Sequence, residues 1–339
     1  MLQEFKSFRE QAELMLQRGI SGPVEQSKDD LIKELERNLR FINYYRLSAY
    51  WYPFRQTRNE KGVTITESSV IPGTKWIDVR NLYMFDRRLR QLIFDAIARI
   101  EIALRTQLAH VWAKQTGRIN PQGRTNSYKN SFDEIQSTLE LVDGYYSKSK
   151  TDWAIFGKKG LCISHAKDLP VWVFVEFTTF GNLEKLLTKG LKRQVVREIA
   201  HNMGIDEADF FLSGIKLLKD VRNTCAHQGR IWNTRWLSKN KDAILRDPSA
   251  DTLWEQACAD SQPLLQGKDK TAAVLTFCNV ILQTVAPNSQ WGERVVDLIQ
   301  KTNIAGIMIP KAIGFNSSLW YQHPLWNIAT VKQTANHVQ

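Results

Sequence analysis

The stretch FDRRLRQLIFDAIARIEIALRTQLAHVW, residues 85–112, decides the fold class of this chain. Its apolar residues recur at steps of one, three and four positions: Leu89, Leu92, Ile93, Ala96, Ile97, Ile100, Leu104, Leu108 and Val111. That spacing follows one face of an α-helix. We predict that Asp86 lies at the N-cap or in the first turn, and that Gly117 stops the helix shortly beyond its end.

Helical periodicity also dominates the rest of the chain. Further helices are predicted over residues 27–41, 132–146, 171–187, 193–203, 207–227, 253–264, 270–285 and 293–302. Only GVTITESSV, residues 62–70, alternates like a strand, and it is interpreted as a short hairpin or a loop. The predicted fold class is therefore all-α. We divide the chain into an N-terminal helical region (1–76), a core (77–240) and a C-terminal helical extension (241–339).

The charge balance points to a polyanionic partner. The chain has 339 residues, with 46 Lys+Arg against 35 Asp+Glu and a formal net charge of +11. A hydrophobic content of 43% excludes wholesale disorder. The positive excess is typical of proteins that bind nucleic acid or an acidic membrane surface, and charge alone does not choose between them.

No feature of the sequence predicts a membrane segment, a metal site or a cofactor. Charged residues interrupt the first 20 positions, so no signal-peptide core is expected, and the apolar stretch 170–180 is short and contains Glu176. No CxxC pair or Cys/His cluster occurs around the four cysteines, Cys162, Cys225, Cys258 and Cys278. We expect a cytoplasmic protein with reduced thiols.

The candidate site lies at the end of the helix predicted over 207–227, in the segment RNTCAHQGRIWN (222–233). Gly229 is expected to be the C′ residue that stops this helix. Asn223 and His227 are four residues apart and share a face. Arg222 is five residues from His227, which corresponds to about 140° of rotation and about 7.5 Å of rise.

Arg222 shares its direction on the helix with three apolar residues, Phe211, Ile215 and Ala226. An arginine on an apolar stripe is unusual unless a partner covers it. Arg222 and His227 could serve RNA cleavage, in which the ribose 2′-OH attacks the adjacent phosphate. Histidine transfers a proton near neutral pH, arginine stabilises the phosphorane, and Asn223 could hold the phosphate or fix the imidazole tautomer. The alternative is a favourable interaction of both cations with the helix dipole.

Several segments together resemble the AbiD/AbiF-like abortive-infection proteins of bacteria, which belong to the HEPN superfamily. They are INYYRLSAYWYPF (42–54), residues 85–110, LPVWVFVEFTTFGNLEKL (169–186), RNTCAHQGRIWN (222–233) and HPLW (323–326). The superfamily signature is an arginine and a histidine separated by four to six residues. Arg222 and His227 match it, with four residues between them.

This resemblance implies an HEPN-like helical bundle that forms a homodimer or a higher homo-oligomer, in which two motifs face each other in one RNase site. The activity implied is that of a metal-independent endoribonuclease, with Arg222, Asn223 and His227 as catalytic residues. Such a protein is the toxin of an antiviral toxin–antitoxin system, restrained by a small structured noncoding RNA. A non-catalytic RNA-binding protein of the same fold is the alternative.

Other residues have two interpretations each. Arg46 lies among aromatic residues (Tyr44, Tyr45, Tyr50, Trp51, Tyr52 and Phe54) that either stack on RNA bases or form a packed corner. Glu101 and Arg105 form either a simple ion pair or a polar layer that supports the motif. Six further arginines either bind phosphates or are solvated: Arg87, Arg88, Arg90, Arg99, Arg230 and Arg235. Anionic lipid is the disfavoured partner, because no basic amphipathic helix stands out.

Overall fold

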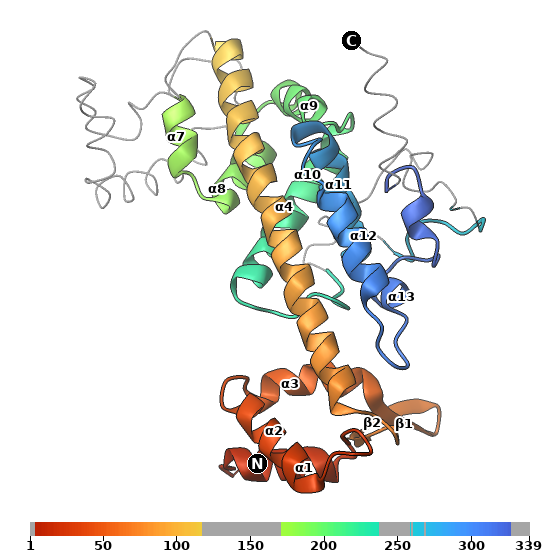
Figure 1. The fold of residues 1–339 in the computed structure, drawn as a ribbon. Helices are drawn as coiled ribbons and strands as arrows, with labels where there is room; N and C mark the ends of the chain where they lie inside the picture. The colour runs from red at the N-terminus through yellow and green to blue at the C-terminus, as the bar shows by residue number, and fades with distance from the viewer. Residues whose placement is uncertain (1–3, 117–170, 237–257, 259, 268, 327–339) are drawn as a thin grey trace.

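The computed structural model describes residues 4–116, 171–236, 258, 260–267 and 269–326, and helices dominate this part of the chain (Figure 1). The predicted all-α class is confirmed. The long helix is α4 (Trp76–Thr116), which runs through most of the length of the molecule. At 1.5 Å per residue it is about 60 Å long. Its neighbours include α7 (Val171–Phe177), α9 (Arg193–Asn202), α10 (Ala208–Ala226), α11 (Thr271–Val285) and α12 (Trp291–Lys301).

Helix α4 begins earlier than predicted. Its buried stripe continues backwards through Val79, Leu82 and Phe85, which are at most 2% exposed. Asp86 therefore lies inside the helix and is fully buried, so the prediction of a capping role is wrong. The helix ends at Thr116, next to the predicted stop, Gly117, which lies outside the described residues.

Three helices and a hairpin surround the first turns of α4 (Figure 1). Their bounds are α1 (Phe8–Gln17), α2 (Lys28–Leu39), α3 (Tyr44–Trp51), η1 (Tyr52–Phe54), β1 (Arg55–Glu60) and β2 (Val63–Val70). Ser27 caps α2 by accepting a hydrogen bond from the Asp30 backbone N–H at 3.1 Å. The antiparallel hairpin turns at Lys61 and Gly62, both with positive φ, as a tight two-residue turn requires. Of the two interpretations of residues 62–70, the hairpin is confirmed.

The remaining elements include five that contact α4, together with α8, which packs on α10, and α13, which packs on α11. They are α7 (Val171–Phe177), α8 (Phe180–Lys185), η3 (Leu186–Gly190), α9 (Arg193–Asn202), α10 (Ala208–Ala226), α11 (Thr271–Val285), α12 (Trp291–Lys301), α13 (Ile309–Ile313) and η5 (Trp320–Gln322). The helices predicted over 193–203, 207–227, 270–285 and 293–302 are confirmed. Helices α1, α3 and α13 were not predicted. The helix predicted over 132–146 lies outside the described residues.

Two predicted helices are wrong in part. The helix expected over 171–187 breaks at Thr179, whose side chain accepts a hydrogen bond from the Asn182 N–H and so starts α8. In the helix expected over 253–264, the described residues 258 and 260–264 are not helical. Ser261 has a φ of +62° and Pro263 follows it, and neither is compatible with a continuous helix.

The buried side chains of all three parts of the chain join one hydrophobic core. The HPLW segment belongs to it, because the Asn279 amide on α11 donates to the Leu325 carbonyl and Trp326 packs near Trp291 and Trp320. The three-part division made from the sequence stays a prediction. No helix in the described part of the chain is long and apolar enough to cross a bilayer.

We predict that Gly214→Ala weakens the contact between α10 and α11. A Cβ atom at Gly214 would lie 1.9 Å from Cζ of the fully buried Phe277. The free energy of unfolding, measured by chemical denaturation, is expected to fall by about 1–3 kcal/mol. Gly181→Ala is the control, because its Cβ would meet no atom closer than 3.8 Å. Equal stability of Gly214→Ala and the wild type would contradict this packing.

Candidate functional site

The candidate site is built on the end of α10. Its last helical residue is Ala226, and His227 is the C-cap. The N–H of Gln228 donates to Cys225 O at 3.0 Å and the N–H of Gly229 donates to Thr224 O at 2.8 Å. This pair of bonds is a Schellman motif with Gln228 at C′. Gln228 has a φ of +57°, so the prediction that Gly229 is the C′ residue is wrong.

Gly229 has a different reason to be glycine. A Cβ atom there would lie 2.6 Å from Thr224 Cγ2 and 3.2 Å from Thr224 O, because the chain folds back closely over the last turn of α10. The left-handed conformation at Gln228 costs a non-glycine residue about 1 kcal/mol. The end of α10 is therefore a tight turn held in place by contacts from outside the helix.

The motif side chains lie at the surface end of α10. Asn223 and His227 are exposed, and Arg222 is half-buried. Arg222 Nη1 is 3.4 Å from Asn223 Oδ1, and no described carboxylate forms an ion pair with this guanidinium. Phe211 and Ile215 are buried but Ala226 is exposed, so Arg222 lies at the edge of the buried face rather than within it.

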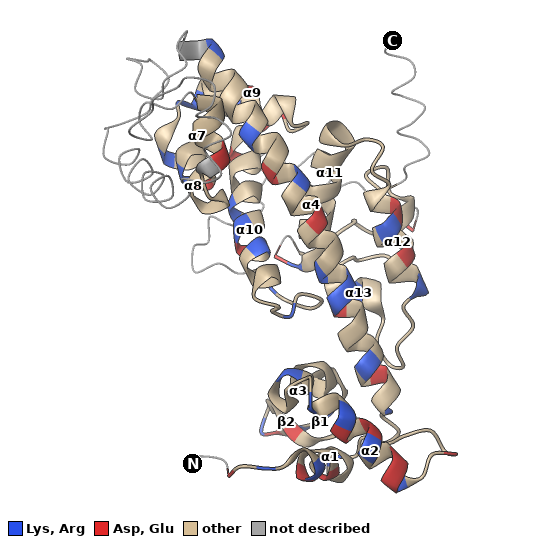
Figure 2. Cartoon of the chain, turned by 60° about the vertical axis from the view of Figure 1, so that its left-hand side comes forward, with Lys and Arg blue, Asp and Glu red and all other residues tan. Residues whose placement is uncertain are grey.

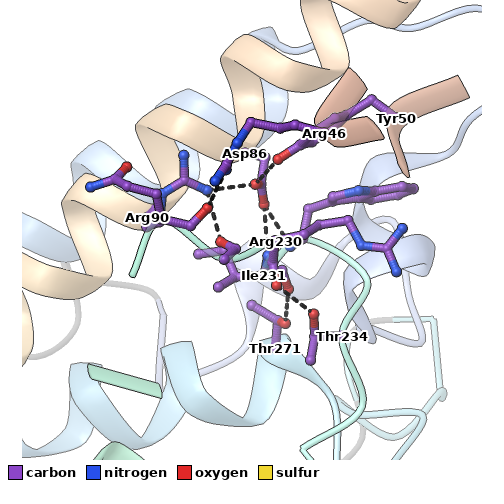
Figure 3. Close-up of polar contacts among 11 residues, drawn as sticks. Arg46, Tyr50, Asp86, Arg90, Arg230, Ile231, Thr234 and Thr271 are labelled. Carbon is purple, nitrogen blue, oxygen red and sulfur yellow. Dashed lines mark hydrogen bonds and ion pairs between the residues drawn. The ribbon is translucent and has the colours of Figure 1, made fainter. Parts of the chain in front are cut away.

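A buried carboxylate, Asp86, holds the chain that follows the motif (Figure 3). Its Oδ1 accepts the backbone N–H groups of Ile231 at 3.0 Å and Trp232 at 2.8 Å. Its Oδ2 accepts the Tyr50 hydroxyl and Arg90 Nη1, both at 2.7 Å. Asp86 thereby joins α3, α4 and the segment after α10, which satisfies every demand of a buried carboxylate.

Neighbouring groups complete this polar cluster. Arg90 Nη1 also donates to the Gly229 carbonyl at 3.0 Å, and Thr271 Oγ1 of α11 donates to the Ile231 carbonyl at 2.6 Å. Burial and the adjacent Asp86 carboxylate raise the pKa of Tyr50, so its hydroxyl stays protonated and donates. Arg90, 4% exposed and paired with Asp86, is structural rather than a phosphate ligand.

Arg46 and Arg230 tie α3 to the motif turn. Arg46 Nη1 donates to the Gln228 carbonyl, and Arg230 Nη1 donates to the Ala49 carbonyl at 3.0 Å. The surrounding aromatic residues are largely a packed corner, because Tyr50, Trp51 and Phe54 are buried and Tyr44 packs edge-on against Trp51. Tyr45 and Tyr52 remain exposed.

Of the three other predicted supporting residues, two lie apart from the motif turn. Glu101 and Arg105 form an ion pair, and Arg105 Nη2 donates to the Thr178 carbonyl between α7 and α8 at 3.0 Å. Along α4 they are about 22 Å or more from Asp86 at 1.5 Å per residue. They support the α7–α8 junction and are not joined to the motif. Arg87 is exposed on α4, with no ion pair among the described residues.

Sequence reasoning missed the role of Asp86, although a signal was present. Asp86 is seven residues from both Val79 and Ile93, which places it on the apolar stripe of α4, and Arg90 follows four residues later. A carboxylate on a buried stripe needs donors from elsewhere in the fold.

Burial also raises the pKa of the nearby Cys225 thiol to about 12, so this thiol is not a nucleophile at neutral pH.

Comparison with known proteins gives one match. A family model described as Abi-like protein matches residues 37–233, more than half of the chain. No curated protein and no solved structure matches. The matched range includes Arg46, Asp86 and the whole of α10, and it ends just after the backbone N–H groups that Asp86 binds. The described residues contain no group of three or more His, Cys, Asp or Glu that could hold a metal ion.

Asp86→Ala is predicted to lower the free energy of unfolding by about 3–5 kcal/mol, because it leaves a buried cation and three further donors without their acceptor. Asp95→Ala is the matched control, since Asp95 also pairs with an arginine four residues later on α4 but is 36% exposed. Its effect is expected to stay below about 1 kcal/mol. Similar losses for both variants in chemical denaturation would contradict the role assigned to Asp86.

Gln228→Gly is predicted to raise the free energy of unfolding by about 1 kcal/mol, because glycine adopts a positive φ without steric cost. The backbone carbonyl that Arg46 binds is retained. Gly229→Ala is the opposite case and is expected to destabilise, because its Cβ clashes with Thr224. Destabilisation by Gln228→Gly would show that Gln228 does not occupy the left-handed position.

Proposed function

This chain belongs to the Abi-like family of abortive-infection proteins, and from that premise we propose that it is a metal-independent endoribonuclease toxin of the HEPN type. One observation carries the proposal. The end of α10 presents Arg222, Asn223 and His227 at the surface, next to a turn whose carbonyls bind Arg46 and Arg90. Asp86 binds the backbone that follows this turn. Such fixation is typical of catalytic constellations, in which small displacements reduce the rate strongly.

The reaction is an internal phosphoryl transfer in RNA. The ribose 2′-oxygen forms a bond to the adjacent phosphorus, and the bond from phosphorus to the 5′-oxygen breaks. The 2′-hydroxyl proton leaves to a base and the 5′-oxygen takes up a proton, so the products are a 2′,3′-cyclic phosphate and a 5′-hydroxyl. His227 transfers these protons. Arg222 stabilises the charge that develops on the phosphorane, and Asn223 orients the phosphate.

The complete site requires a second copy of the chain. Arg222 and His227 project about 140° apart on α10, and the hydrogen bond of Arg222 goes to Asn223 instead. In a homodimer two motifs face each other, and the histidine of one copy acts beside the arginine of the other. Phe94 supports a partner-covered face, since this large apolar side chain of α4 is 41% exposed.

The partner that restrains the toxin is a small structured noncoding RNA. The net charge of +11 supports binding of such a polyanion, and Arg87 offers an exposed guanidinium that has no ion pair among the described residues. Sequencing of RNA that co-purifies from the native host tests this point. A discrete small RNA is expected, and a purified protein without any enriched RNA would contradict it.

A non-catalytic RNA-binding protein of the same fold is the second candidate. The separation of Arg222 and His227 within one chain favours it, because the single chain does not assemble a catalytic pair. The two candidates differ in whether the purified dimer cleaves RNA.

We expect His227→Ala to lower RNA cleavage by about 10²–10⁴-fold and Arg222→Ala by about 10²–10³-fold. Both variants should relieve growth arrest on expression. His201→Ala is the matched control, because His201 is also an exposed histidine in the last turn of a helix, α9, but lies outside the motif. Its cleavage rate should be unchanged.

Cleavage is expected to persist in EDTA, since neither proposed step requires a metal. Its loss in EDTA would contradict the metal-free mechanism. RNA binding without cleavage by a pure, RNA-free dimer would instead establish the second candidate. Unchanged cleavage by His227→Ala would exclude the motif as the site of chemistry.

A further inference from the structure

A basic cavity lies on the far side of α4 from the motif turn. It has a volume of about 340 Å³ and is lined by Arg80, Asn81, Met84, Phe85 and Arg88 of α4 and by Lys301, Thr302 and Asn303 at the end of α12. Arg88 and Arg90 are separated by about 200° around the helix, so the side of α4 that bears Arg88 is turned away from Asp86 and the motif. The cavity is therefore distinct from the candidate RNase site.

The arginines of this cavity differ from the cations that lie later in α4. The charged residues of the helix can be followed in Figure 2. Each cation from Arg90 onwards is ion-paired: Arg90 with Asp86, Arg99 with Asp95, Arg105 with Glu101 and Lys114 with Glu198. Arg80 and Arg88 are exposed and have no ion pair within the described residues. Among the described residues, the cations of α4 without an ion pair are thus Arg87 and the two arginines that border the cavity.

The walls of the cavity are held in place by the fold. The Ala305 N–H donates to Asp78 Oδ1 at 3.3 Å, which ties the segment after α12 to the start of α4. Ile304 and Phe85 are each 2% exposed. Lys301 is paired with Asp297, so Arg80 and Arg88 carry the uncompensated charge. A ligand would therefore find a formed cavity with two free guanidinium groups.

We infer that this cavity binds a nucleoside polyphosphate. Arg80 and Arg88 are about 12 Å apart along the axis of α4, and both line the cavity. A chain of phosphates can meet both guanidinium groups, whereas a single phosphate meets one. The amides of Asn81 and Asn303 offer donors and acceptors for the nucleoside. A volume of about 340 Å³ suits one nucleotide rather than a length of RNA.

Calorimetric titration of the full chain tests this inference, and it measures binding alone, so its result is independent of RNase activity. The probes are ATP, AMP, inorganic tripolyphosphate and a single-stranded oligouridylate of about ten nucleotides. ATP is expected to bind more tightly than AMP and tripolyphosphate. Arg80→Ala and Arg88→Ala should each weaken ATP binding by about ten-fold or more.

Arg99→Ala is the matched control, because it removes the same charge from an exposed position of α4 outside the cavity. It should change ATP affinity by less than about two-fold. Circular dichroism spectra should be unchanged in all three variants. Absence of ATP binding, or equal losses in Arg99→Ala and the cavity variants, would overturn the inference. So would tripolyphosphate binding as tightly as ATP, or oligouridylate binding that depends on Arg80 and Arg88 when ATP binding does not.

Discussion

The arrangement of the candidate site depends on the hydrogen bonds and the ion pair of the buried Asp86 carboxylate. A buried carboxylate is strongly unfavourable unless donors surround it, and here the donors come from α3, α4 and the chain after α10. The backbone groups of Ile231 and Trp232 lie more than 140 residues away in sequence. Because the carboxylate is satisfied in one arrangement, the turn that follows His227 can occupy only one position against α4.

Helix α4 separates two chemically different regions. On one side its ionic groups bind other parts of the fold. Asp86 and Arg90 bind backbone groups of the segment after α10, and Arg105 binds the backbone at the α7–α8 junction. On the other side, Arg80 and Arg88 have no ion pair within the described part of the chain and lie beside a cavity formed with α12. The positive charge behind the net charge of +11 is therefore not evenly available for binding a ligand, because many cations are already in ion pairs.

Local signals predicted much of the helical fold and failed where a tertiary or capping contact intervened. The apolar stripes of α4, α9, α10 and α11 were visible in sequence because a helix buries one face at regular spacing. The break at Thr179 was not, because the side chain competes for the backbone there. Arg222 was expected on an apolar face, but the exposed Ala226 shows that this face ends before the last turn of α10.

The sequence by itself determined the all-α class, because helical periodicity depends on neighbouring residues, and the family, which the match over residues 37–233 shows. The assignment of Arg222, Asn223 and His227 as site residues also comes from the sequence and stays a prediction. Only the tertiary structure decided that Asp86 is a buried anchor, that Arg46 and Arg230 bind backbone carbonyls, and that Arg80 and Arg88 share a cavity with α12. These contacts join residues that are far apart in the chain. Their geometry follows from how the helices pack, which no local pattern records.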